Sequence, residues 1–146
     1  MDEEIARCIR RNGEMAFMMI DLDYFKKYND TFGHIAGDIV LKTLAQILQD
    51  HFHEPGHLVC RYGGEEFCVL LPDCTKSKAL SLAESLRKKV EHQELMLRRQ
   101  KTNITISIGI AMVPTQAKIK EELILKADDA LYDAKEGGRN KVCLAS

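Results

Sequence analysis

The chain has no tryptophan, only three prolines, and five cysteines without a Cys-x-x-Cys pair among its 146 residues. An odd, scattered set of thiols argues against a disulfide framework or a zinc site, and favours reduced cysteines in a cytosolic domain. We expect Cys60 and Cys68 to be small core residues. No apolar run reaches the roughly 18 to 20 residues that a membrane span needs. The charged N-terminus also lacks the apolar segment of a signal peptide.

The chain also lacks an excess of one charge, because it has 21 basic and 22 acidic residues. A net charge of −1 argues against a nucleic-acid-binding surface. What remains is ordinary globular composition, with 45% hydrophobic and 29% charged residues. No linker, repeat or low-complexity segment divides the chain. We expect one cytoplasmic domain over residues 1–146 that makes no membrane contact of its own, although it could be the cytoplasmic part of a membrane-anchored protein.

Hydrophobic periodicity predicts an α+β fold. Gly33 and Gly37 are expected to bracket a loop, and the alternating Ile104, Ile106, Ile108 and Ile110 predict a half-buried strand. Because the hairpin falls mid-chain, we expect a mixed, largely antiparallel central sheet flanked by helices. Helices are predicted over residues 3–12, 24–32, 38–51, about 79–90 and 119–134, the last with a glycine cap at Gly137-Gly138; strands are predicted over residues 15–22, 103–111 and 141–144, with a hairpin over 58–71.

The stretch RYGGEEFCVLL, residues 61–71, places two glycines and two acids inside apolar sequence. It predicts a hairpin with a two-residue Gly63-Gly64 loop, since glycine reaches positive φ without a Cβ clash. A hairpin alone needs no acid at its mouth. Central strands of one sheet could bring Glu65 and Glu66 beside Asp21, at the end of the first strand. Magnesium prefers such oxygen ligands, and the second glutamate could then act on a nucleophile.

Other residues near these acids admit two interpretations each. Asp23 shares a face with Asp21 on an extended chain, but it could simply cap the next helix. Asn29 and Asp38 offer an amide and a carboxylate to a guanine edge, although Asn29 could simply end a helical turn and Asp38 could cap the next helix. His34 is expected to stabilise the loop rather than bind metal. Lys26 could meet phosphate. Lys135 and Arg139 could clamp a triphosphate or only complement a helix dipole.

Taken in order, IDLDYFKKYND, FGHIAGD, RYGGEEF, ITISIGIA and ADDALYDAKEGGRN resemble the GGDEF-type diguanylate cyclase domain, from about Ala16 to Val142. The signature here reads Gly63-Gly64-Glu65-Glu66-Phe67. The resemblance implies a palm-like fold, as in nucleotide cyclases and polymerase palms. It also implies the condensation of two GTP molecules into cyclic di-GMP and two pyrophosphates, at the interface of an antiparallel homodimer.

The resemblance also implies a role for individual residues. Glu66 would be catalytic, either assisting deprotonation of the ribose 3′-hydroxyl or holding a second metal ion. Mg²⁺ (or Mn²⁺) would be bound by the side chains of Asp21 and Glu65 and the Leu22 carbonyl. Guanine would be read by Asn29 and Asp38, with Leu41 lining its pocket. The triphosphate would be contacted by Tyr24, Phe25, Lys26, Gly63, Gly64, Lys135 and Arg139, the first two through backbone amides.

Two departures from the family pattern stand out. Where many members carry an Arg-x-x-Asp inhibitory site, this chain has Glu54-Pro55-Gly56-His57, so we expect no inhibitory site. The family's usual N-terminal segment, which closes the guanine pocket and connects to an upstream sensor or regulatory domain, is absent from this sequence. We therefore expect a domain excised from a longer protein or one with a shortened start. This departure keeps an alternative open, a catalytically inactive, GTP-binding regulatory module.

Overall fold

The protein is described by a computed structural model that covers residues 1–97 and 100–146. The described chain runs, in order, through α1 (Asp2–Arg10), β1 (Met15–Leu22), α2 (Phe25–Phe32), α3 (His34–His51), β2 (Leu58–Arg61), β3 (Glu66–Leu71), α4 (Lys76–Glu91), β4 (Leu95–Leu97), β5 (Gln100–Thr102), β6 (Ile106–Val113), α5 (Lys120–Glu136) and β7 (Val142–Leu144).

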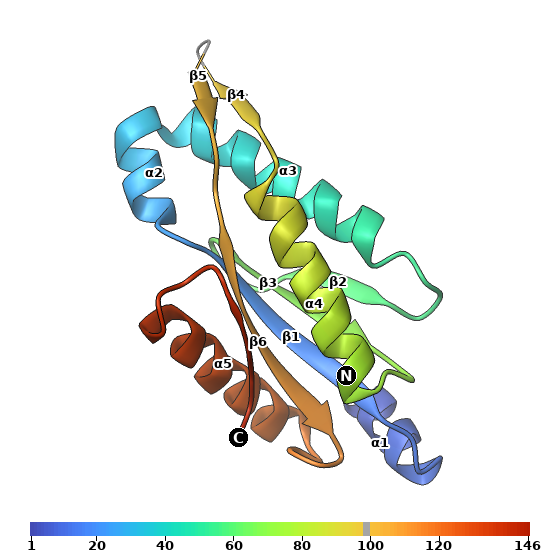
Figure 1. The fold of residues 1–146 in the computed structure, drawn as a ribbon. Coiled ribbons are helices and arrows are strands. Elements are labelled where there is room, and N and C mark those ends of the chain that lie inside the picture. Colours follow the sequence, from blue (N-terminus) through green and yellow to red (C-terminus); the bar gives the residue numbers. More distant parts are fainter. Residues whose placement is uncertain (98–99) are drawn as a thin grey trace.

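One five-stranded sheet, in the order β2-β3-β1-β6-β7, forms the centre of the fold. Strand β1 lies in its middle and pairs antiparallel with both β3 and β6, and only β7 runs parallel to its neighbour. Strands β4 and β5 form a separate hairpin that extends beyond the sheet (Figure 1). The predicted α+β class, with a mixed and mostly antiparallel sheet, is confirmed.

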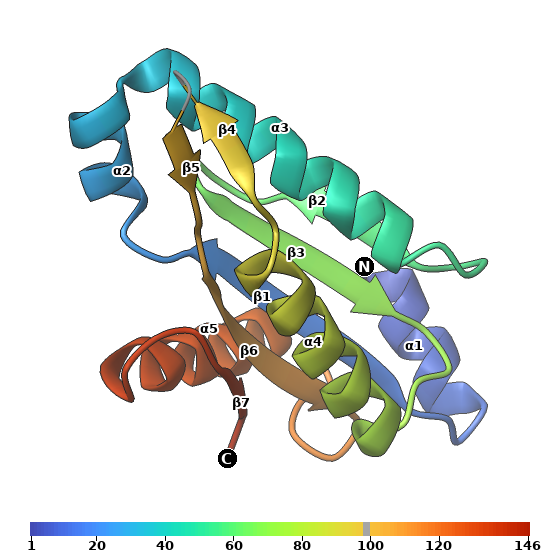
Figure 2. The same ribbon diagram turned by 45° about the horizontal axis from the view of Figure 1, so that its top comes forward.

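Helices cover both faces of the sheet, with α3 and α4 on one side and α5 on the other (Figure 2). The side chains of β1 alternate between the two cores: Ala16, Met18 and Ile20 face α3 and α4, whereas Met15, Phe17 and Met19 face α5. Every residue of β1 is buried as a result, as its run of apolar residues predicted. Strand β6 is also buried along its whole length, so the half-buried strand predicted there is wrong.

Helix α3 begins at His34, four residues earlier than predicted. Gly37 is therefore a helical residue and not the end of a loop, and Asp38 lies inside the helix, so its interpretation as a cap is wrong. The glycine cap after α5 is confirmed: Gly138 has a φ of 118°, and the Arg139 N–H donates to the Ala134 carbonyl at 3.0 Å.

Two further expectations fail at the hairpin. Its loop is four residues long, because β2 ends at Arg61 and β3 begins at Glu66. Cys60 is exposed on the edge strand β2 rather than buried in the core, and Cys68 is half-buried. The β4–β5 hairpin, between α4 and β6, was not predicted. Among the helices of the described residues, none is long and apolar enough to cross a membrane.

Candidate active site

The pairing of β1 with β3 brings the predicted acids together. Asp21 and Glu66 are direct partners in this antiparallel register, at the end where β1 leaves the sheet. The Leu22 N–H lies 3.5 Å from the Glu65 carbonyl oxygen, so the Asp21-Leu22 backbone borders the hairpin loop. Asp21 and Glu66 therefore lie side by side at the end of the central strands, and Glu65 follows the loop that adjoins them.

Asp21 is buried, with an exposed fraction of only 3%. Its Oδ2 forms an ion pair with Lys135, which approaches from the C-terminal turn of α5, whereas its Oδ1 is buried without a hydrogen-bond partner. Burial raises the pKa of Asp21, an effect that Lys135 opposes. A buried, unpartnered carboxylate oxygen is costly unless a cation or donor meets it, so this donor set fits a hard divalent cation. In the described residues no cluster of three His, Cys, Asp or Glu side chains forms a metal cage. The ligand's own oxygens and water would have to complete the coordination.

Glu66 lies half-buried beside the other acids. Desolvation and then the nearby charges of Asp21 and Asp128 raise the pKa of Glu66, while Lys135 counteracts them. A carboxylate with a raised pKa accepts a proton more readily near neutral pH. The site is therefore electrostatically suited either to proton transfer at Glu66 or to a cation that relieves the crowding of negative charge.

The backbone of the hairpin loop does not require glycine at positions 63 and 64. Neither Gly63 nor Gly64 has a left-handed φ, and a Cβ on either would meet no atom within 4 Å. Their lack of a side chain keeps the space beside the acids open. Arg61 holds the loop from within, donating from Nε to the Gly63 and Gly64 carbonyls at 3.3 and 3.1 Å and from Nη2 to Gly64 at 2.5 Å. Because their carbonyls bond to Arg61, the loop is held in one conformation.

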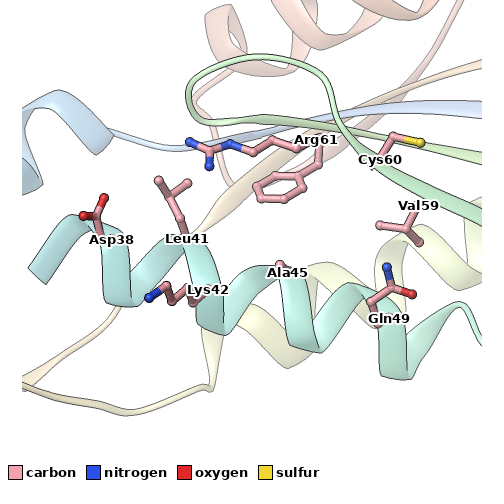
Figure 3. Close-up of a pocket in the computed structure, with 9 residues that line it drawn as sticks. Asp38, Leu41, Lys42, Ala45, Gln49, Val59, Cys60 and Arg61 are labelled. Atoms are coloured by element: carbon pink, nitrogen blue, oxygen red, sulfur yellow. The ribbon is translucent and has the colours of Figure 1, made fainter. Parts of the chain in front are cut away.

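A cavity of about 240 Å³ lies between α3 and the β2–β3 hairpin (Figure 3). Asp38 and Leu41, which the family resemblance assigns to guanine, line it together with Arg61 and Phe67. Figure 3 shows Asp38 at one end of the cavity and Gln49 at the other. The lining combines apolar side chains with a few polar and charged ones, a composition typical of small-molecule sites.

Asn29 does not line this cavity, but its side chain lies against Gly37, the residue before Asp38. A Cβ on Gly37 would lie 1.8 Å from the Asn29 Oδ1 atom, and that oxygen is buried without a hydrogen-bond partner. A bound base could supply the missing partner.

Basic groups and helix α2 complete the site. Tyr24 precedes α2 with a left-handed φ of 56°, and the N–H groups of Phe25 and Lys26 open the helix, where backbone donors lack intrahelical partners. The Tyr24 side chain is exposed, and the Arg139 guanidinium stacks over its ring at 4.6 Å from the centroid. The Lys26 side chain is exposed as well.

Asp23 has a different environment from Asp21. Its Oδ1 accepts from Ser107 Oγ at 2.6 Å, and its Oδ2 accepts from Thr105 Oγ1 at 2.6 Å and from the Asn140 N–H at 2.9 Å. Helix α2 has no side-chain cap, so the interpretation of Asp23 as a helix cap is wrong.

The Glu54–His57 segment has its acidic residue paired both within the segment and with helix α4. Glu54 Oε2 lies 3.0 Å from Lys78 Nζ and 3.4 Å from His57 Nε2. An acidic group paired with a lysine occupies the position where the family's inhibitory site would present an arginine.

Three residues at the site were missed or misread in the sequence. Arg61 stands two positions before the glycines, and its basic charge beside a tight turn was a usable signal. Asp128 on α5 acts on Glu66 through its charge; it lies within the stretch ADDALYDAKEGGRN, but it was given no role there. Asp23 was noticed, but its partners were not.

The fold and the site together define a palm-type domain with an acidic, glycine-lined site at the end of its central hairpin. The family model described as "Diguanylate cyclase, GGDEF domain" matches residues 1–141, and the chain belongs to this family. Diguanylate cyclase A of Treponema denticola is 42% identical over 131 residues, which are 90% of this chain and 35% of that protein. The chain spans about a third of the length of the curated relatives it matches.

Two solved structures are similar over nearly the whole chain. The active GGEEF domain of a diguanylate cyclase from Vibrio cholerae has a TM-score of 0.91 at 32% identity, over 99% of this chain and 90% of that one. The GGDEF domain of DgcB from Caulobacter crescentus, in complex with c-di-GMP, has a TM-score of 0.90 at 32% identity, over 98% and 84%.

Proposed function

We propose that this domain is a diguanylate cyclase that condenses two GTP molecules into cyclic di-GMP and two pyrophosphates. The observation that carries the proposal is the pairing of Asp21 with Glu66 beside the open Gly63-Gly64 loop. Similarity to diguanylate cyclases over nearly the whole chain supports the same conclusion.

Each side of the site has a task in this proposal. Asn29 and Asp38 read the guanine edge, and Leu41 packs against the base in the cavity beside α3. The N–H groups of Tyr24 and Phe25, together with Lys26, Lys135 and Arg139, hold the triphosphate. The Gly63-Gly64 loop admits the phosphates because it presents backbone without side chains. Phosphoryl transfer depends mainly on such positioning and on neutralised charge.

Mg²⁺ or Mn²⁺, held by Asp21, Glu65 and the Leu22 carbonyl, would neutralise phosphate charge when bound. The unpartnered Asp21 Oδ1 supports this assignment. Lys135, which is paired with Asp21 in this structure, would then be available to the phosphates. Glu66 either accepts the proton of the attacking 3′-hydroxyl or holds a second metal ion.

The reaction requires two GTP-loaded domains, each attacking the α-phosphate held by the other. Exposed apolar side chains adjoin the site residues in the chain: Tyr24, Ile35, Ile39 and Tyr62. They suit an antiparallel homodimer that brings the two sites face to face and excludes water. In a longer protein, an upstream sensor or regulatory domain would control this encounter in the cytoplasm.

Chromatography of the nucleotides tests the proposal. Concentrated protein incubated with GTP and Mg²⁺ should yield cyclic di-GMP, and Glu66→Ala should abolish that peak while still binding GTP. Activity per domain should also rise with protein concentration. Bound GTP without product from the unaltered protein would instead identify a regulatory GTP-binding module. Activity per domain that stays flat on dilution of a demonstrated monomer would exclude the two-domain reaction.

A further inference from the structure

Arg139 and Asn140 form a turn with an unusual backbone. Both have left-handed φ values, 65° and 48°, although neither is glycine. Such conformations are unfavourable for residues with a Cβ and persist only where the surrounding structure enforces them. The turn carries the Arg139 guanidinium over Tyr24, beside the start of α2.

The backbone of this turn is held by Asp23, which is buried with an exposed fraction of 4%. Asp23 Oδ2 accepts the Asn140 N–H at 2.9 Å, and the same carboxylate accepts from Ser107 in β6 and from Thr105, which immediately precedes that strand. Both carboxylate oxygens are engaged, in contrast to the unpartnered oxygen of Asp21. Asp23 is therefore fitted to fix the turn and not to bind a ligand directly.

The Asn140 side chain is held by a second element, helix α4. Its Oδ1 accepts from Arg87 Nη1 at 2.9 Å, and its Nδ2 donates to Glu91 Oε2. Arg87 is itself fixed by Glu84, with Nη2 to Oε1 at 2.6 Å. The turn is thus attached at two points: its backbone is bonded to Asp23, just after β1, and its Asn140 side chain is bonded to α4.

We propose that Asp23 and Asn140 are positioning residues that set Arg139 against the terminal phosphates of the bound nucleotide. This inference rests on the proposed function, because it takes Arg139 as a phosphate clamp. Neither residue touches the nucleotide. Each acts by holding two left-handed residues in place, so that the guanidinium is oriented before the ligand arrives and less freedom is lost on binding.

The test compares two ligands that differ in the phosphates Arg139 is meant to hold. The α,β-methylene analogue of GTP keeps all three phosphates and resists attack, whereas GMP ends at the first. At a constant Mg²⁺ concentration, Asp23→Asn should lower the affinity for the analogue about tenfold, as expected for a lost charge-assisted contact. GMP binding should change less than about twofold, within the variation of a distant substitution. Asn140→Gly, which keeps the N–H and tolerates positive φ, should act in the same direction.

Arg139→Ala separates positioning from general damage. If Asp23 acts through Arg139, adding Asp23→Asn to Arg139→Ala should cost less than about a further twofold in affinity for the analogue. Gln116→Ala is the matched control, because Gln116 forms partly buried hydrogen bonds to Met112 and Ala145 at the opposite end of β6. It should leave the ratio of the two affinities unchanged.

The possible results separate the two proposals. If the unaltered protein binds the analogue no better than GMP, the phosphate clamp of the proposed function fails. If it does discriminate, but Asp23→Asn and Asn140→Gly both keep that preference, the positioning role is wrong. The positioning role would also be overturned if Asp23→Asn lowered the affinities for both ligands equally, or if the effects of Asp23→Asn and Arg139→Ala were independent. Should Asp23→Asn fail to fold, Asn140→Gly decides the question alone.

Discussion

Substituting Gly37 with alanine should separate nucleotide binding from stability. The new Cβ would lie 1.8 Å from the Oδ1 and 2.9 Å from the Cγ of Asn29, and 3.3 Å from the Cζ of Phe25. Atoms cannot approach so closely, so the Asn29 amide must swing away from the pocket. The amide is the end of a rotatable side chain and is able to do so without unfolding the helix.

Two free-energy terms oppose each other in the folded state. Alanine is favoured over glycine in a helix interior by about 0.8 to 1 kcal/mol. Displacing Asn29 costs packing of a similar size, so the free energy of unfolding should change by less than about 1 kcal/mol. Nucleotide binding has no such compensation, because it loses the Asn29 contact, which is worth about 1 kcal/mol or a roughly fivefold change in affinity.

Calorimetric titration with the α,β-methylene analogue of GTP, alongside thermal unfolding, measures both quantities. Asn29→Ala should weaken binding to a similar degree, and the double variant Asn29→Ala with Gly37→Ala should be no weaker than Asn29→Ala alone. Ser81→Ala, on the exposed face of α4, is the control for helix propensity without a contact. Unchanged binding in Gly37→Ala, with Asn29→Ala impaired, would refute the reasoning; so would additive losses in the double variant.

Two further predictions concern the acids and the loop before the hairpin. Because the pKa of Glu66 is raised above its ordinary 4.5, the folded state resists ionisation of this group and loses stability as the pH rises above that value. Glu66→Gln should therefore raise the melting temperature at neutral pH and lose this advantage in acid; an equal melting temperature at every pH would contradict it. At the Glu54–His57 segment, titration should detect no tight cyclic di-GMP binding, since Glu54 is paired with Lys78 at 3.0 Å. Tight binding that disappears in Glu54→Ala or His57→Ala would show this to be wrong.

The sheet and the meeting of its acids could be predicted because their signals are local. Strand β1 is apolar on both faces, and a two-faced strand belongs at the centre of a sheet covered by helices. With Asp21 at the end of that strand and Glu66 at the mouth of a hairpin, adjacency follows once the two strands pair. Family motifs then supplied the roles that spacing alone left open.

Other features could not be predicted because they depend on distant contacts. Gly37 suggested a loop, since glycine is common in loops, but here it serves a close approach of Asn29 within a helix. Cys60 was expected in the core because it lies in an apolar run. The run belongs to β2, an edge strand, where burial depends on what covers the sheet and not on the strand's own sequence.

The Asp-x-Asp motif shows most clearly what a sequence leaves undecided. Either aspartate could have been the ligand, since both share a face on an extended chain. The partners of Asp23 stand 82, 84 and 117 residues away along the chain, so no local pattern reveals them. They engage both of its oxygens, whereas Asp21 keeps one buried oxygen unpartnered. The two carboxylates therefore differ in what they can do: Asp21 has an oxygen left for a ligand, whereas Asp23 holds the turn that, in our proposal, presents Arg139 to that ligand.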